Sequence, residues 1–146
     1  MQAKAKPGEE IGKLVMIGHR ASIRKCSRIA KALVGAHRRG VRVTVVLDKS
    51  QRTDKYSPAD FLRNSGIPTF IDDRHAIAHN KVMVIDGSVV LTGSFNFTKA
   101  AEESNAENLL VISDAALAAK YAANFQAHLA HSEKYIGKLQ SRPSRR

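Results

Sequence analysis

Apolar residues repeat along the chain with two periods, and each period predicts a kind of element. A helical period runs through residues 27–40 and through 57–65, which opens with a Ser-Pro pair typical of a helix start. The period is weak in 9–26, where two glycines interrupt it. It is regular in 114–139, where one stripe repeats every four residues: Leu117, Tyr121, Phe125 and Leu129.

Four other segments are short, rich in β-branched residues and bounded by turn residues, which is typical of strands. They cover 41–48, 67–73, 81–93 and 105–113. The third contains Asp86-Gly87, a strong turn signal between two apolar arms, and therefore predicts a hairpin. Helices that alternate with apolar strands predict an α/β sandwich whose sheet is largely covered.

The charge composition of the chain indicates what kind of partner it binds. The chain has 146 residues, which predicts one domain, and 24 basic against 13 acidic residues give a formal net charge of +11. That excess favours a polyanionic partner, either nucleic acid or an anionic membrane surface. The single cysteine, Cys26, excludes an internal disulfide and a cysteine-based zinc site.

The sequence also carries an expectation about the compartment. No apolar run reaches 18 residues, so no transmembrane helix is predicted. The first residues lack the apolar segment of a secretory signal. We therefore expect a cytoplasmic protein, or else the mature or truncated form of a periplasmic or exported one.

Candidate chemistry gathers at the start of the predicted hairpin. His79 and Lys81 are two residues apart, so on a strand their side chains point to the same side. A lysine ammonium binds an anionic oxygen, and an imidazole offers a nitrogen for attack or proton transfer. This pair suits a phosphoryl group.

The end of the hairpin adds polar groups to the same region. Gly93 lets a backbone approach a ligand closely, and the Ser94 hydroxyl and Asn96 amide can donate to phosphate oxygens. Glu107 begins the next strand, where a carboxylate near His79 would orient its ring. The remaining histidines are interpreted as structural or solvated: His19, His37, His75, His128 and His131.

The spacing His79-x-Lys81-x4-Asp86-x6-Gly93-Ser94 resembles the HKD motif of the phospholipase D superfamily. Together with the extension through residue 108, it is similar to the small bacterial Nuc-type endonucleases of that superfamily. The resemblance covers roughly residues 27–135. It implies a phospholipase D-like α/β sandwich, with a mixed sheet flanked by helices and one HKD motif per chain.

The resemblance further implies a phosphodiesterase that needs no metal ion or other cofactor. His79 would be the nucleophile that forms a phosphohistidine, and Glu107 would orient it. Lys81, Ser94 and Asn96 would hold the phosphate. Asp86 and Gly93 match the motif, but Asp86 falls in the predicted turn and is given a structural role.

Superfamily chemistry uses two HKD motifs, and this chain has one, so we expect a homodimer that pairs two copies of His79. The expected activity is nonspecific cleavage of DNA, with RNA left open as a further substrate. Hydrolysis of phospholipid headgroups and an inactive nucleic-acid-binding module stay open as alternatives.

The organisation along the chain departs from the family at one end. The family has an early strand that residues 1–26 do not display in the expected form, so this segment is predicted to be atypical and shortened. Residues 27–138 form the predicted catalytic domain, and 139–146 form a basic tail.

Overall fold

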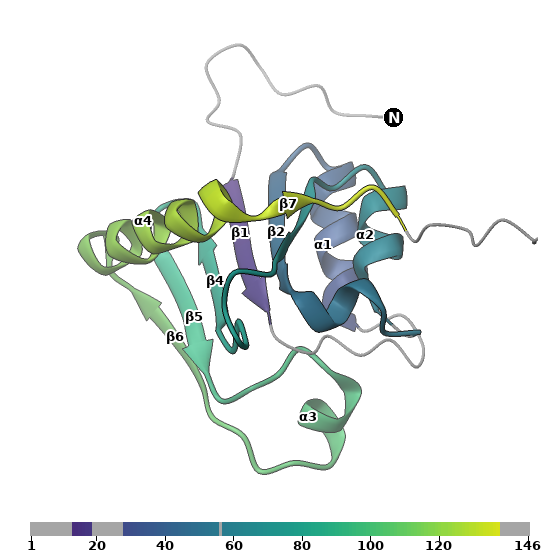
Figure 1. The fold of residues 1–146 in the computed structure, drawn as a ribbon. Coiled ribbons are helices and arrows are strands. Elements are labelled where there is room, and N and C mark those ends of the chain that lie inside the picture. Colours follow the sequence, from purple (N-terminus) through teal and green to yellow (C-terminus); the bar gives the residue numbers. More distant parts are fainter. Residues whose placement is uncertain (1–12, 19–27, 56, 138–146) are drawn as a thin grey trace, which may run out of the picture.

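A computed structural model describes residues 13–18, 28–55 and 57–137. They form one mixed seven-stranded sheet in the order β6-β5-β4-β1-β2-β3-β7 (Figure 1). β1, β2 and β3 run parallel, and β4 lies antiparallel to β1. The strands are β1 (Lys13–Gly18), β2 (Arg42–Asp48), β3 (Thr69–Asp72), β4 (Lys81–Ile85), β5 (Val89–Gly93), β6 (Leu109–Ser113) and β7 (Glu133–Lys134).

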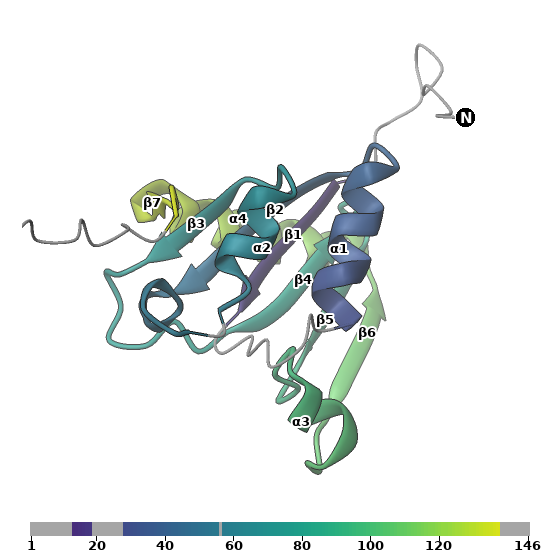
Figure 2. The same cartoon turned by 90° about the vertical axis from the view of Figure 1, so that its right-hand side faces the viewer.

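Helices cover the two faces of this sheet. α1 (Arg28–Arg38) and α2 (Ala59–Asn64) lie on one face, and α4 (Ala115–His131) crosses the other (Figure 2). A short 3-10 turn, η1 (Lys49–Arg52), follows β2, and α3 (Lys99–Glu103) stands in the connection from β5 to β6. The architecture is the predicted α/β sandwich with a mixed sheet.

The alternation of side chains along β2 divides the core into two layers. Val43, Val45 and Leu47 pack with α1 and α2, whereas Val46 packs under α4. All four side chains are buried. The apolar stripe predicted on the last helix supplies the second layer, which is formed with Leu117, Tyr121, Phe125 and Leu129.

The predicted hairpin is present, and its turn explains two residues. Asp86 has φ 51° and Gly87 has φ 63°, which are the left-handed values that a two-residue hairpin turn needs. The amide of Ser88 donates to the carbonyl of Ile85 and closes the turn at 3.1 Å. Asp86 therefore lies at the opposite end of β4 from Lys81.

The helical interpretation of residues 9–26 is wrong where the structure describes them. Residues Lys13–Gly18 form β1, which pairs with β2 on one side and β4 on the other. The family has an early strand that these residues did not display in the expected form. An inner strand, β1, is nevertheless present here. Residues 1–12 and 19–27 lie outside the described part.

The last helix is shorter than predicted. α4 ends at His131, and Glu133–Lys134 turn back as β7 to pair with β3. The predicted tail at 139–146 lies outside the described residues, and the division of the chain at 27 and 138 stays a prediction. Within the described residues, no helix combines the length and apolar character that crossing a membrane requires.

Gly93 permits a close approach, but the neighbour is protein backbone. Its φ is 152°, and a Cβ at this position would overlap the carbonyl oxygen of Asn108. That same oxygen accepts hydrogen bonds from the amides of Ser94 and Phe95, at 3.0 and 3.3 Å. Gly93 thus permits the close backbone contact at the β5–β6 junction, while the expected approach of a ligand stays a prediction.

Replacing Gly93 with alanine should lower the free energy of unfolding by about 3 kcal/mol, because a steric clash adds to backbone strain. Gly87→Ala is the matched control, since its Cβ would meet open space and only the left-handed φ opposes it, at about 1 kcal/mol. Urea denaturation measures both. Equal losses would contradict the assigned role of Gly93.

Candidate active site

Lys81 and His79 meet at the start of β4, inside the sheet. The Lys81 side chain is 7% exposed, whereas His79 is exposed. Lys81 Nζ lies 2.9 Å from the ring nitrogens of His79 and donates to the His79 carbonyl oxygen at 2.9 Å. The predicted pair is therefore formed, and it presents an imidazole to solvent with an ammonium beneath it.

Ser94 and Glu107 meet where β5 passes into the connection to β6. The Ser94 hydroxyl donates to Glu107 Oε2 at 2.6 Å and accepts from the backbone amide of Asn108 at 3.0 Å. The Asn105 side chain donates to Glu107 Oε1 at 2.9 Å. Both oxygens of Glu107 are thereby held. The predicted contact of Glu107 with His79 stays a prediction.

The electrostatics connect these two groups of residues. Burial lowers the pKa of Lys81, and the charge of Glu107 opposes that change. The hydrogen bond from Ser94, followed by the one from Asn105, lowers the pKa of Glu107, and the Lys81 charge adds to this. A cationic and an anionic side chain therefore act on one another at the mouth of the hairpin.

Asn96 lies next to this region between two aromatic residues. Its side-chain oxygen Oδ1 is buried and has no hydrogen-bond partner within the described residues. Phe97 is buried in the core, and the half-buried Phe95 packs against the same cluster. The Asn96 amide thus retains bonding capacity, while its role as a phosphate ligand stays a prediction.

The sequence interpretation missed a polar cluster on the α4 side of the sheet. Asp72 at the end of β3 is surrounded by three imidazoles, those of His75, His128 and His131. Burial alone would raise the pKa of Asp72, but hydrogen bonds from His128 and then from His75, with His131 close by, hold it far below its usual value. The signal was present as Asp-x-x-His and His-x-x-His, two spacings that are common in unrelated sequences.

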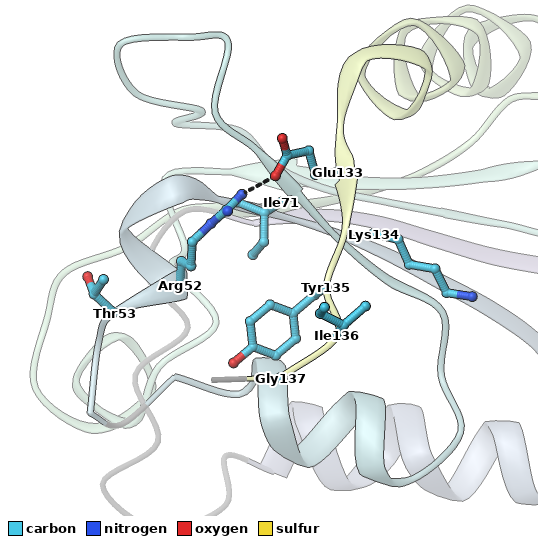
Figure 3. Close-up of a pocket in the computed structure, with 8 residues that line it drawn as sticks. All are labelled: Arg52, Thr53, Ile71, Glu133, Lys134, Tyr135, Ile136 and Gly137. Carbon is cyan, nitrogen blue, oxygen red and sulfur yellow. Dashed lines mark hydrogen bonds and ion pairs between the residues drawn. The ribbon is translucent and has the colours of Figure 1, made fainter. Parts of the chain in front are cut away.

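A separate pocket of about 530 Å³ lies between η1, β3 and β7 (Figure 3). Arg52 and Glu133 form an ion pair of 2.8 Å across it. Tyr135 donates to Asp60 at 2.9 Å, and burial together with this carboxylate raises the pKa of Tyr135 to about 12. None of the predicted catalytic residues lines this pocket.

Comparison with known proteins agrees with this fold. The family described as cardiolipin synthase, PLD-like domain, matches residues 13–129. The structure of Nuc from Salmonella typhimurium, a phospholipase D family member, superimposes with a TM-score of 0.77 at 38% identity and covers 84% of this chain and 81% of its own. The chain therefore belongs to the PLD-like domain family of the phospholipase D superfamily.

Curated relatives carry names of phosphodiester hydrolases, as the sequence predicted. The phospholipase D of Rickettsia bellii is 46% identical over 106 residues, which is 73% of this chain and 53% of the relative. The mitochondrial cardiolipin hydrolase of Xenopus tropicalis is 37% identical over 101 residues, or 69% and 48%. The chain spans about half the length of the curated relatives it matches.

Ser94→Ala should raise the pKa of Glu107 toward its ordinary value, because it removes the hydrogen bond that contributes most to the lowering. NMR titration of the Glu107 carboxyl carbon measures the midpoint. Ser88→Ala, in the β4–β5 turn, is the control and should leave the midpoint unchanged. An unaltered Glu107 midpoint in Ser94→Ala would refute the assigned hydrogen bond.

Proposed function

We propose that this chain is a nonspecific endonuclease that cleaves DNA without a metal ion at the reacting phosphate. The observation that carries the proposal is the pairing of a buried ammonium, Lys81, with an exposed imidazole, His79. Burial removes water from the Lys81 ammonium and disfavours its charged form. An anionic phosphodiester bound beside it would stabilise that charge. The same contact would bring phosphorus to the imidazole.

The proposed reaction has two displacements at phosphorus. A ring nitrogen of His79 attacks, a P–N bond forms and the P–O bond to the leaving group breaks. The His79 of a second subunit protonates the leaving oxygen and then takes a proton from water. That water attacks the phosphohistidine, breaks the P–N bond and releases the first His79.

Charge favours nucleic acid as the substrate. The formal net charge of +11 is distributed over a chain of 146 residues, which raises the affinity for a phosphate backbone and makes binding depend on salt. Arg52 in η1 is engaged by Glu133 and Asp73. The remaining basic side chains would supply the contacts.

A homodimer supplies the second histidine, and β6 offers a surface for it. β6 is an edge strand that exposes three consecutive apolar side chains: Leu109, Leu110 and Val111. Leu109 is paired with Gly93, next to Ser94, so this edge begins at the candidate site. Exposed apolar residues on an edge strand favour association with another chain.

A second candidate function, phospholipid headgroup hydrolysis, is favoured by an apolar groove of about 310 Å³ between α1 and the sheet. Phe95 lines it and is flanked in sequence by Ser94 and Asn96, so a lipid chain in the groove would place its phosphate near the predicted phosphate ligands. The groove is lined by Ile29, Ala32, Leu33, Ala36, Met83, Leu91, Phe95, Phe97 and Leu109.

Incubation with supercoiled plasmid in excess EDTA tests the proposed function. The parent protein should nick the plasmid, and His79→Ala should be slower by about a thousandfold or more, because it lacks the nucleophile. His37→Ala is the matched histidine control and should retain activity. Circular dichroism in the same buffer verifies that every variant is folded.

The outcome separates the candidate functions. Folded parent protein that leaves the plasmid intact but hydrolyses phospholipid vesicles would replace the nuclease with the lipid hydrolase. Salt-dependent DNA binding without turnover on either substrate would support the inactive binding module. Equal nicking by the parent and His79→Ala would exclude His79 as the nucleophile.

Val111→Lys should weaken the proposed dimer, because a charge would have to be buried at β6, where Val111 is now 64% exposed. Sedimentation velocity should show a shift toward monomer, with nuclease activity falling in parallel. Ile136→Lys, an equally exposed apolar site beside β7, is the control. A parent protein that is monomeric and active would contradict the shared site.

A further inference from the structure

Two short sequence motifs that are far apart in the chain meet at one point beside β3. Asp72 and His75 come from the end of β3 and the loop after it, and His128 and His131 come from the last turn of α4. One ligand atom from each residue, either an imidazole nitrogen or a carboxylate oxygen, lies within 4.8 Å of all the others. The cluster shares no residue with the predicted catalytic set.

The imidazoles converge on a single carboxylate oxygen. Asp72 Oδ2 lies 2.7 Å from His128 Nδ1, 2.9 Å from His75 Nδ1 and 3.3 Å from His131 Nε2. The three ring centroids are 4.9, 5.2 and 5.6 Å apart, and the rings are tilted rather than stacked. Three imidazole nitrogens thus approach one oxygen, and the centroids of their rings form a nearly even triangle.

Hydrogen bonding does not account for this arrangement completely. His131 Nε2 is buried and, within the described part of the chain, makes no hydrogen bond, because its approach to Asp72 satisfies the distance but not the geometry. An unsatisfied buried nitrogen of this kind calls for a further partner. The nitrogen is one of the four converging ligand atoms.

We propose that Asp72, His75, His128 and His131 bind a transition-metal cation of the zinc class. Three imidazoles and one carboxylate are a ligand set that zinc accepts in tetrahedral sites. Bonds of about 2.0–2.1 Å place tetrahedral ligand atoms about 3.3 Å apart, so the present cluster needs shifts of about 1 Å. The ion would replace the crowded contacts at Asp72 Oδ2 and satisfy His131.

The surroundings suit such an ion. The Asp72 side chain is fully buried, whereas His75 is 46% exposed and leaves a route from solvent. With His128 bound through Nδ1, its Nε2 faces the side chain of Asn80 at 3.4 Å. Ligand histidines are commonly fixed by a polar group on the second ring nitrogen, and Asn80 occupies that place.

An ion bound at this cluster would also affect the candidate active site. Asn80 stands between His79 and Lys81 in the chain, and the loop from Asp72 to Asn80 leads directly into β4. A bound ion would fasten this loop to the end of α4. It would therefore act on the position of His79 without touching the reacting phosphate, and the proposal does not depend on the proposed substrate.

Titration of the full chain with zinc sulfate tests the proposal, after treatment with EDTA and exchange into chelator-free buffer. Calorimetry should show about one ion per chain, and the melting temperature should rise with zinc. His131→Ala and His75→Ala should each weaken binding about tenfold or more and abolish the rise. Cobalt(II) should give the visible absorption of a tetrahedral site in the parent protein.

His79→Ala is the matched control, because it removes an exposed histidine next to Asn80 that the cluster does not contain. It should bind zinc as tightly as the parent. Absence of saturable binding by the folded parent would overturn the proposal, and so would unchanged affinity in both cluster variants. Loss of binding in His79→Ala would place the ion at the candidate active site and refute the assigned ligands.

Discussion

The buried ammonium of Lys81 is the constraint on which the site depends. A lysine at the start of an interior strand loses most of its hydration, and this loss disfavours the charged form. The His79 carbonyl accepts from it, and the charge of Glu107 opposes the loss. The His79 carbonyl and Glu107 compensate only part of the lost hydration of the Lys81 ammonium. An anionic ligand beside the exposed His79 imidazole would therefore be stabilised.

The sheet supplies the rigidity that this arrangement needs. β4 is paired with β1 from Lys81 to Ile85 and with β5 from Val82 to Ile85, so the backbone is held at Lys81 on the β1 side and on both sides from the next residue onward. Gly93 lets β5 and the start of β6 meet closely, and the Asn108 backbone then holds Ser94. Ser94 in turn holds Glu107. The candidate site therefore rests on backbone pairing, which holds its residues on rigid elements.

The sequence predicted the parts of the fold that have a local cause. Asp86-Gly87 specifies the hairpin turn through its backbone conformation, and the spacing of His79, Lys81 and Ser94 identified the family. β1 was missed because a short apolar run is ambiguous between helix and strand until its neighbours are known. The end of α4 was missed because the pairing of Glu133–Lys134 with β3 is a long-range contact that the local pattern does not reveal.

The histidine cluster was beyond prediction for a related reason. Asp72 and His128 are 56 residues apart, and each contributes to a spacing that has no specificity alone. Their meeting depends on α4 crossing the sheet above β3, which is a property of the assembled fold. Long-range packing therefore creates the cluster. Local sequence patterns show its histidines only one at a time, and each was interpreted as structural or solvated.

The stereochemical course at phosphorus distinguishes a phosphohistidine intermediate from direct attack by water. A chiral phosphorothioate diester would be hydrolysed in isotopically labelled water, and the configuration of the product determined. We expect overall retention, because attack by His79 and then by water inverts the centre twice. Inversion would show a single direct displacement by water and would contradict a phosphohistidine intermediate.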